Sequence, residues 1–481
     1  MSTCVLKISA VQITLRPVAL PQGPRDTFAR LRALPGHGLL ESALQRPGLG
    51  DWSYISGPAR ATLYTAPNGL TQLLREGQEL SRWADPIEAL AACTGDAATP
   101  QINGHRPPGL DFIGGWIGAL SYDLARHIER LPTLAAADPA LPLMHWAAVD
   151  QVLAFDHAAQ QWWEVTVQGP HDAFPWNDGH ERARWDHTLA LAAKNEAPAA
   201  LPWRAGPRTQ RMDRAGYEAG VERIREWIAA GDVFQVNLTR REEAAFEGDA
   251  WALYEALAAA HPAPFGAFIE GPGFAIASCS PERFLKLRGR EVEARPMKGT
   301  APRHADAAQD AAERNALGAS IKNRAENVMI VDLMRNDLGR VAELGSVRVP
   351  ELFALEPYAG VWQMVSAVRA TLRAGVGAAG LLRACWPPGS MTGAPKVRAM
   401  EIIEALEPVQ RGFYSGSVGY LSCDGSMDLS VVIRSAVVAG GRVMLQFGGG
   451  IVADSDPAAE WAETLAKGGR LTAVLDAQTR S

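Results

Sequence analysis

The chain has 481 residues, about three times the roughly 150 residues of an average domain, so the sequence predicts one large unit or two to three domains. Lys and Arg number 47 and Asp and Glu number 53, and the resulting net charge of −6 argues against a nucleic-acid-binding protein. Hydrophobic residues make up 47% of the chain and charged residues 21%, which is typical of a folded globular protein and not of a disordered chain.

The sequence shows neither a membrane span nor a disulfide pattern. No uncharged run reaches the roughly 18 residues that a membrane-spanning helix needs, and the first residues lack the basic and apolar regions of a signal peptide. The cysteines form no CxxC pair, which argues against a disulfide framework and a zinc site; they are Cys4, Cys93, Cys279, Cys385 and Cys423. We therefore expect a cytoplasmic protein with reduced thiols.

The N-terminal 200 residues predict strands joined by loops. Short apolar runs such as residues 61–64 and 162–167 are interrupted by Gly and Pro. Residues 196–210 then carry three prolines and no apolar periodicity. This segment is the best candidate for a boundary, which we place between residues 205 and 206.

Helical patterns follow the boundary. Apolar residues recur at helical spacing from Tyr217 to Ile228 and stop at Gly231, which predicts an amphipathic helix. Residues 306–338 lack proline and are rich in Ala, Glu, Asn and Arg, so we expect one long helix or two abutting helices. A further helix is predicted to begin at Pro395.

Apolar, β-branched runs near the C-terminus predict adjacent strands at residues 416–421, 429–438 and 443–447. Glycines 448–450 then lead toward a final helix, which Ser455 or Asp456 can cap and which has Pro457 in its first turn. Strands and helices thus mix throughout the chain.

A lysine in the segment RPMKGTAPR, residues 295–303, is the first candidate for chemistry. Lys298 lies between Pro296 and Gly299, where we expect a tight turn that desolvates the side chain. Desolvation lowers the pKa of a lysine and makes its neutral amine available as a nucleophile. The alternative is an ordinary solvated surface lysine.

Acidic residues in two predicted helices are candidates for binding a hard cation such as Mg²⁺. Glu326 lies with Asn327 and Asp332 among apolar neighbours. Glu460 and Glu463 are three residues apart, so they share one face of their helix, and one of them could join Glu326 at a metal. The alternative for the first group is salt bridging on the helix surface.

Two glycine-containing segments could approach an anion. Glycines 448–450 allow close approach of backbone N–H groups, although a plain turn after a strand is the alternative. The segment GSMTGAPK, residues 389–396, lacks the spacing of a phosphate-binding loop, so an ATPase is disfavoured. Arg434, expected on a strand between Ile433 and Ser435, is a candidate for binding a substrate carboxylate.

Five motifs, in order along the chain, together resemble the chorismate-utilising enzymes. That family comprises anthranilate synthase component I, aminodeoxychorismate synthase component I, isochorismate synthase and salicylate synthase. The motifs are residues 280–284, 295–303, 324–340, 389–405 and 448–464, and residues 39–42, 231–238 and 262–265 extend the resemblance toward the N-terminus.

This resemblance implies an α/β (α+β) fold like that of anthranilate synthase component I, with a large β-sandwich core flanked by helices. Residues 1–205 would form an N-terminal anthranilate synthase component I-like region, and residues 206–481 the chorismate-binding catalytic domain.

Two positions indicate the branch of the family. Lys298 resembles the lysine of aminodeoxychorismate synthases, where anthranilate synthases carry alanine. In that branch the amine is thought to attack C2 of chorismate and to be displaced by ammonia at C4. Gln235 stands where isochorismate and salicylate synthases have a lysine that activates water, and glutamine is not a base. Amination of chorismate, toward para-aminobenzoate and folate, is therefore favoured over addition of water.

The resemblance also implies roles for other residues. Glu282 would be the general acid/base, and Glu326 and Glu463 would bind Mg²⁺ with Glu460 nearby. The substrate-binding set would be Gly299, Thr300 and Gly449 at the ring carboxylate and Arg434 and Tyr420 at the enolpyruvyl carboxylate. Gly448, Gln363 and Lys467 complete the set. At Gln363 the family usually has histidine, and glutamine can form hydrogen bonds there but carries no proton. This leaves more of the acid role to Glu282 and disfavours pyruvate elimination.

The ammonia source and one ligand lie outside these motifs. Neither Cys279 nor Cys423 fits the reactive cysteine of a glutaminase, so a separate glutamine amidotransferase subunit is implied. The possible tryptophan pocket of the family corresponds to Glu41, Ser42, Pro264 and Phe265, and the sequence leaves its occupancy open.

Two alternatives to an aminodeoxychorismate synthase remain. An anthranilate synthase component I is opposed by Lys298. A non-catalytic homologue that binds chorismate or tryptophan is opposed by the joint presence of Lys298, Glu282, Glu326 and Glu463.

Overall fold

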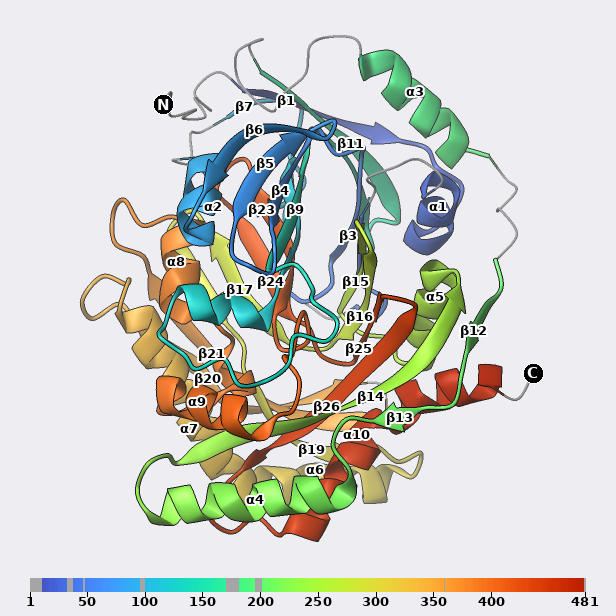
Figure 1. Cartoon of the computed structure of the whole chain (residues 1–481). Helices are drawn as coiled ribbons and strands as arrows, with labels where there is room; N and C mark the ends of the chain where they lie inside the picture. Colours follow the sequence, from blue (N-terminus) through green and yellow to red (C-terminus); the bar gives the residue numbers. More distant parts are fainter. Residues whose placement is uncertain are drawn as a thin grey trace.

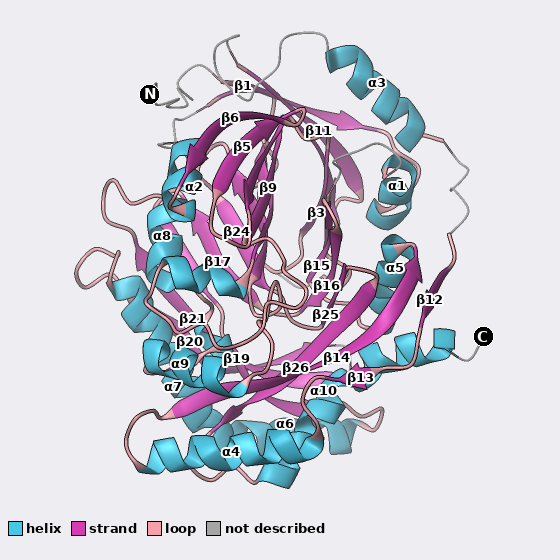
Figure 2. Cartoon of the chain, in the orientation of Figure 1, coloured by secondary structure: helices cyan, strands magenta, loops and turns pink. Residues whose placement is uncertain are grey.

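The computed structural model describes residues 11–32, 38–45, 48–95, 100–169, 181–194, 201–358 and 360–479. Strands of these residues form two large sheets that face each other across an apolar layer, and helices cover their outer faces (Figures 1 and 2). The predicted α+β fold with a β-sandwich core flanked by helices is thus confirmed.

The first sheet contains strands from both halves of the chain: strands from residues 203–280 and 435–451 form one side, and strands from residues 12–168 form the other. Its order is β12 (Trp203–Ala205), β14 (Gln235–Gly248), β26 (Arg442–Ile451), β25 (Ser435–Ala439), β16 (Phe274–Ser280), β15 (Phe265–Gly271), β2 (Leu39–Glu41), β3 (Trp52–Ser56), β10 (Gln151–Asp156), β11 (Gln161–Gln168), β1 (Gln12–Val18) and β7 (Gln101–Asn103). Two short strands pair with β14, namely β13 (Thr209–Gln210) and β22 (Gly393–Ala394).

The second sheet likewise contains strands from both halves of the chain. Its order is β19 (Met297–Pro302), β21 (Val361–Thr371), β18 (Glu291–Ala294), β17 (Arg283–Arg288), β24 (Met427–Val431), β23 (Ser417–Ser422), β8 (Gly115–Leu120), β9 (Met144–Val149), β4 (Ala61–Thr65), β5 (Thr71–Arg75) and β6 (Gln78–Trp83), with β20 (Arg348–Tyr358) on β21.

The helices of the described residues flank the two sheets (Figure 2). They are α1 (Pro24–Leu31), α2 (Pro86–Thr94), α3 (Glu181–Ala192), α4 (Arg214–Ala229), α5 (Ala250–Ala260), α6 (Ala307–Ala319), α7 (Ile321–Gly339), α8 (Ala378–Cys385), α9 (Lys396–Leu406) and α10 (Pro457–Thr479), together with the 3₁₀ helices η1 (Tyr122–His127) and η2 (Gly389–Met391).

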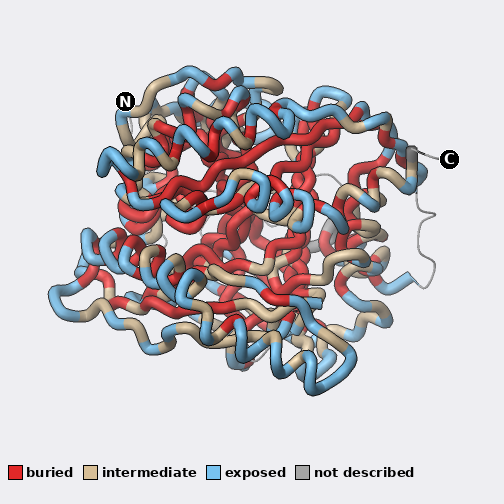
Figure 3. The backbone as a smooth tube through the Cα atoms, turned by 90° about the horizontal axis from the view of Figure 1, so that it is seen from below, coloured by how far each residue is buried: buried red, intermediate tan, exposed pale blue. Residues whose placement is uncertain are grey.

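Alternating side chains divide the interior into layers. Along β10, Val152 and Ala154 face the core between the sheets, whereas Leu153 and Phe155 face the core beneath the outer helices. Because both faces of the central strands are covered, most of their residues are buried. The interior of the molecule accordingly consists mainly of buried chain in Figure 3. This burial explains why these strands read as continuous apolar runs.

The two halves of the chain share both sheets. The N-terminal strands join the C-terminal block through β2 on β15 and through β8 on β23. β12 lies in the region predicted to be N-terminal, yet it pairs with β14 at the far end of the first sheet. The predicted boundary after residue 205 stays a prediction, and its residues 196–200 lie outside the described part of the chain.

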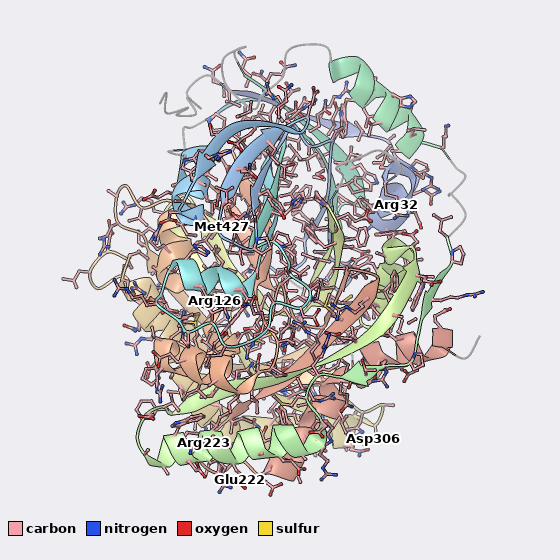
Figure 4. The ribbon with its side chains drawn as sticks, in the orientation of Figure 1. Arg32, Arg126, Glu222, Arg223, Asp306 and Met427 are labelled. Carbon is pink, nitrogen blue, oxygen red and sulfur yellow. The ribbon has the colours of Figure 1, made fainter. Side chains whose placement is uncertain are left out.

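The predicted helices form where caps and apolar faces agree. Residues 306–338 make two abutting helices, α6 and α7. Asp306 accepts a hydrogen bond from the Gln309 N–H at 2.8 Å, and Ser320 ends the first helix and caps the second. In α4, Tyr217 and its apolar neighbours are buried, whereas Glu222 and Arg223, labelled in Figure 4, are exposed.

One predicted strand is wrong. Residues 429–438 do not form a single strand, because the chain leaves the second sheet after β24 and enters the first sheet at β25. Arg434 lies in the connection with a φ of +53°, so it is not on a strand as expected.

No helix among the described residues is long and apolar enough to cross a membrane. Four of the five cysteines lie in this part of the chain, and each is buried and free of a disulfide; Cys4 lies outside the described residues.

Candidate active site

Most of the predicted site residues line one cavity of about 540 Å³, built from β19, β26, α7, α10 and the segments beside β17, η2 and β25. The predicted residues in its wall are Glu282, Lys298, Gly299, Thr300, Glu326, Gln363, Arg434, Gly448, Glu460, Glu463 and Lys467. Segments separated by more than 150 residues in the sequence, such as β19 and α10, therefore meet at one site.

Lys298 lies on β19 and not in the tight turn expected from the sequence. The strand has an irregular register between Met297 and Thr300, and Gly299 takes a φ of +90°, which a residue with a side chain rarely adopts. The Lys298 Nζ donates a hydrogen bond to the main-chain oxygen of Ser390 at 3.2 Å. Burial lowers the pKa of Lys298 from its usual range, and this outweighs the opposing effect of Glu326.

Glu282 supplies a carboxyl group in the same wall. It is 5% exposed and follows β16, where its main-chain oxygen accepts a hydrogen bond from the Val431 N–H at 3.0 Å. Burial raises the pKa of Glu282 to about 7, against the opposing effects of a Ser390 side-chain hydrogen bond and of Lys298. A carboxyl group with this pKa can both donate and accept a proton near neutral pH.

Three acidic side chains face the cavity from α7 and α10. Burial raises the pKa of Glu326 and of Glu460, and the negative charge of Glu463 raises both further. For Glu463 itself, burial acts to raise the pKa, but the ion pair with Lys467 at 2.5 Å outweighs it and the pKa is lowered. Acidic groups that repel one another in this way favour a bound cation.

Two lysines offset part of this negative charge. The Lys322 Nζ lies 3.8 Å from Glu460 and 4.0 Å from Glu326, and Lys467 pairs with Glu463. In the part of the chain that is described, no group of three or more His, Cys, Asp or Glu side chains is spaced to hold a metal ion. The oxygen donors fit Mg²⁺ in kind, and they line one cavity without forming a closed set of ligands.

Glycines 448–450 belong to strand β26, so the plain turn considered from the sequence is wrong. The approach of an anion to their backbone stays a prediction. A Cβ atom at Gly449 would lie 3.1 Å from the Glu460 Oε2 and 3.7 Å from the Glu463 Oε1. The missing side chain therefore lets the acidic residues of α10 approach the strand.

Thr300 and Gln363 are brought together by the pairing of β19 with β21. The two residues are directly opposite in this pair, and the Thr300 Oγ1 donates a hydrogen bond to the Gln363 Oε1 at 3.0 Å. Both line the cavity, as the resemblance implied.

The prediction that Tyr420 and Arg434 act together is wrong. Tyr420 lies between the sheets, stacked on Phe112 with 4.7 Å between ring centroids, and it lines a different cavity. Arg434 lines the larger cavity beside Tyr414, a residue that the sequence did not indicate. Tyr420 points into the sandwich because alternate residues of β23 face opposite sides of the sheet.

Other candidates are structural in this conformation. The Lys396 Nζ pairs with Asp337 at 2.6 Å and donates to the main-chain oxygens of Cys385 and Pro387. Asn327 is hydrogen-bonded to Ser366, and Asp332 forms a surface ion pair with Arg335. Of the acidic and amide residues predicted on α7, Glu326 is therefore the one that faces the cavity.

Gln235 lies behind the cavity wall. It is fully buried, and neither atom of its side-chain amide has a hydrogen-bond partner among the described residues. A Cβ atom at Gly450, which lines the cavity, would lie 2.3 Å from the Gln235 Nε2 and 3.5 Å from the Lys298 Nζ, so glycine at this position leaves room for both side chains.

The four residues predicted to form a tryptophan pocket do come together. Glu41, Ser42, Pro264 and Phe265 line a separate cavity of about 100 Å³. The Ser42 Oγ bridges this wall through the main-chain oxygens of Trp52 and Pro264, at 2.9 Å and 3.0 Å. What occupies the cavity stays a prediction.

Known proteins resemble this chain over most of its length. The family described as chorismate binding enzyme matches residues 56–473. Aminodeoxychorismate synthase component 1 of Klebsiella aerogenes is 43% identical over 463 residues, which cover 95% of this chain and 97% of that protein. Anthranilate synthase component 1 of Streptomyces coelicolor is 42% identical over 468 residues, which cover 95% of this chain and 87% of that protein.

Solved structures agree with the sequence relatives. Anthranilate synthase component I from Streptococcus pneumoniae TIGR4 has a TM-score of 0.76 to this chain at 28% sequence identity, and covers 89% of this chain and 93% of its own. Relatives from Salmonella typhimurium and Escherichia coli, 45% and 38% identical to this chain, also carry the name aminodeoxychorismate synthase component 1. The fold, the cavity and the length of these matches agree on one conclusion: the chain belongs to the chorismate-binding enzyme family.

Proposed function

We propose that this chain is component 1 of an aminodeoxychorismate synthase, which converts chorismate and ammonia to 4-amino-4-deoxychorismate. The observation that carries this proposal is the lysine amine of Lys298 in the cavity wall, with Glu282 beside it. The name of the Klebsiella aerogenes relative supports the same activity.

Lys298 and Glu282 would divide the chemistry between a nucleophile and an acid. The neutral Lys298 amine forms a bond to C2 of chorismate, the two ring double bonds shift, and the C4–O bond breaks while Glu282 gives its proton to the leaving hydroxyl. Ammonia then bonds to C4, the double bonds shift back, and the Lys298 amine leaves C2. The sum is replacement of the C4 hydroxyl by an amino group with release of water.

The remaining residues would bind and orient the substrate. Arg434 and Tyr414 lie together in the wall and suit the enolpyruvyl carboxylate, whereas Gly299 and Thr300 suit the ring carboxylate. Glu326 and Glu463, with Glu460 nearby, would hold Mg²⁺, which would bind the ring carboxylate and stabilise charge as the hydroxyl leaves.

A separate glutamine amidotransferase subunit would supply the ammonia. The relative's name, component 1, supports the existence of a second component. The cysteines of the described residues are buried, and burial raises the pKa of the Cys279 thiol to about 12, which is unsuitable for a glutaminase nucleophile.

Anthranilate synthesis is the second candidate, because the Streptomyces coelicolor relative is nearly as similar. Lys298 and Gln363 oppose it. Lys298 supplies a nucleophile, and Gln363 carries no proton at the position where the family usually has histidine.

Product analysis tests the proposal. The purified chain is incubated with chorismate, Mg²⁺ and ammonium chloride, and the products are separated and weighed by mass spectrometry. We expect 4-amino-4-deoxychorismate, and no product when glutamine replaces the ammonium salt. Anthranilate or isochorismate as the main product would overturn the proposed function, and glutamine-dependent turnover by the chain alone would overturn the separate subunit.

A further inference from the structure

Ser390 lies beside both proposed catalytic groups. Its main-chain oxygen accepts a hydrogen bond from the Lys298 Nζ at 3.2 Å, and its side-chain hydroxyl lies near enough to the Glu282 carboxyl group to lower the pKa of that group. Ser390 is 5% exposed, and all three residues line the same cavity. One residue thus contacts both the amine and the acid through different atoms.

The turn that carries Ser390 is held in place by close packing on α7 and by a hydrogen bond from Arg411. A Cβ atom at Gly389 would lie 2.9 Å from the Leu333 Cδ2, so η2 packs closely against α7. The main-chain oxygen of Met391 accepts a hydrogen bond from the Arg411 Nη1 at 2.6 Å. Arg411 is in turn paired with Glu407 at 2.6 Å, with side chains 1% and 3% exposed. The buried ion pair therefore holds the backbone on the C-terminal side of Ser390.

We propose that Ser390 is a positioning residue that holds the Lys298 amine and the Glu282 carboxyl group in the relative positions that the reaction needs. This inference rests on the proposed function. The Ser390 hydroxyl donates to the ionised carboxylate of Glu282 and accepts from the protonated form, so it fixes the carboxyl group in both states. The main-chain oxygen holds one N–H of Lys298 both as ammonium and as neutral amine.

Few charged groups act on Glu282 directly. Lys298 is the charged side chain that lowers its pKa, and the Met297 N–H and the Ser390 hydroxyl are its other polar partners. The other charged groups in the cavity wall face Lys298 and the acidic cluster; they are Lys322, Glu326, Arg434, Glu460, Glu463 and Lys467.

Removal of the Ser390 hydroxyl should change the pKa of Glu282 in a predictable direction. The hydrogen bond from Ser390 stabilises the ionised form of Glu282, so Ser390→Ala raises the pKa of Glu282 further. The active pair needs a protonated Glu282 and a neutral Lys298, which gives a bell-shaped pH dependence whose limbs belong to the pair. The limb nearer neutral pH moves upward by about one pH unit in Ser390→Ala.

The experiment compares Ser390→Ala, Ser390→Thr and Ser417→Ala with the wild-type chain, all with Mg²⁺ and ammonium chloride. Ser417 is a fully buried serine on β23 whose hydroxyl donates to the Ser430 main-chain oxygen outside the cavity, so it controls for the loss of a buried hydroxyl. Consumption of chorismate is followed from pH 5.5 to 9.5, because it reports turnover whichever product forms. Products are identified in the same samples.

We expect kcat of Ser390→Ala to fall about tenfold with KM changed much less, and the limb near neutral pH to shift upward. Ser390→Thr keeps a hydroxyl and should restore the wild-type limb, and Ser417→Ala should keep it. An unshifted limb in Ser390→Ala overturns the positioning role while amination stands. A wild-type chain that consumes chorismate without aminating it overturns the proposed function, and the limb still decides the role of Ser390. No consumption at all overturns both.

Discussion

Lys298 must be deprotonated to act, whereas Glu282 must be protonated, and the surroundings of each residue favour the state that it needs. Burial lowers the pKa of Lys298, which frees the amine, and raises the pKa of Glu282 to about 7, which keeps part of the carboxyl group protonated at neutral pH. Each state then depends on the other, since each group's charge shifts the pKa of its partner.

Replacement of Lys298 separates a catalytic from a structural lysine. Lys298→Ala should lower kcat by at least about 100-fold and leave KM for chorismate largely unchanged, because Glu282 and the acidic cluster remain. Some direct amination by ammonia should survive. Lys298→Arg should be no better than alanine, because the guanidinium stays protonated. Steady-state kinetics with unchanged melting temperatures would check this, and wild-type turnover by either variant would show a structural lysine.

A substitution of Glu326 on helix α7 tests whether this residue binds Mg²⁺. Glu326→Gln removes the charge and keeps the shape, so turnover should fall by at least about 100-fold while the fold survives. Asp332→Asn is the matched control, because this carboxylate lies on the same helix in an exposed ion pair with Arg335. Turnover is measured against Mg²⁺ concentration with circular dichroism for the fold. Equal rates in both variants would exclude a metal-binding role for Glu326.

At the scale of elements, a buried ion pair stabilises the turn that carries Ser390. Glu407 follows α9 and accepts hydrogen bonds from the N–H and Oγ1 of Thr239 besides its pair with Arg411. Removal of one partner of a buried pair leaves the other charge uncompensated.

Glu407→Ala should therefore lower the free energy of unfolding by about 3–5 kcal/mol, as measured by urea denaturation. Glu401→Ala controls for the loss of an ion pair on α9 itself, where Glu401 and Arg398 are 35% and 40% exposed, and should change it by less than about 1 kcal/mol. Similar losses in the two variants would contradict a stabilising role of burial in this pair.

The elements that sequence predicted best are those with local signals. Apolar periodicity indicated α4, and Pro395 indicated the start of α9. For residues 306–338 the sequence left one helix or two open, and the break at Ser320 came from the structure. The division of residues 429–438 between two sheets was missed because the φ of +53° at Arg434 has no glycine or asparagine to mark it.

The candidate site was predicted in a similar way. Most of the side chains that the resemblance implied line one cavity, and most of these lie in the five motifs. Gln363, Arg434 and Lys467 lie outside the motifs, and the catalytic and binding roles of the whole set stay predictions. Tyr420 was misplaced because the face of a buried strand is set by pairing with distant strands, and every residue of β23 is buried. Tyr414 was missed because it lies in the turn before β23, where no periodicity marks the residue that lines the cavity.

At the scale of the whole molecule, both halves contribute to common cores. Leu63 on β4 and Leu429 on β24 belong to the same buried cluster, although they lie on opposite sides of the predicted boundary. Continuous sheets and shared cores predict one cooperative unit.

A substitution in the N-terminal half tests whether both halves unfold as one cooperative unit. Leu63→Ala removes a fully buried side chain and should destabilise the chain by about 2–5 kcal/mol. Hydrogen exchange followed by mass spectrometry should then show faster exchange in β26, far from the substitution, as well as in β4. Faster exchange confined to residues before 205 would show that the halves unfold independently.

The central claim is that Lys298 bonds to the substrate during amination. The most direct measurement is intact-protein mass spectrometry of the wild-type chain incubated with chorismate and Mg²⁺ but without ammonia, followed by peptide mapping. We expect a mass increase equal to chorismate minus one water on the peptide that contains Lys298, absent in Lys298→Ala and discharged when ammonium chloride is added. Full amination of chorismate by Lys298→Ala, with no adduct on the wild-type chain, would contradict the account.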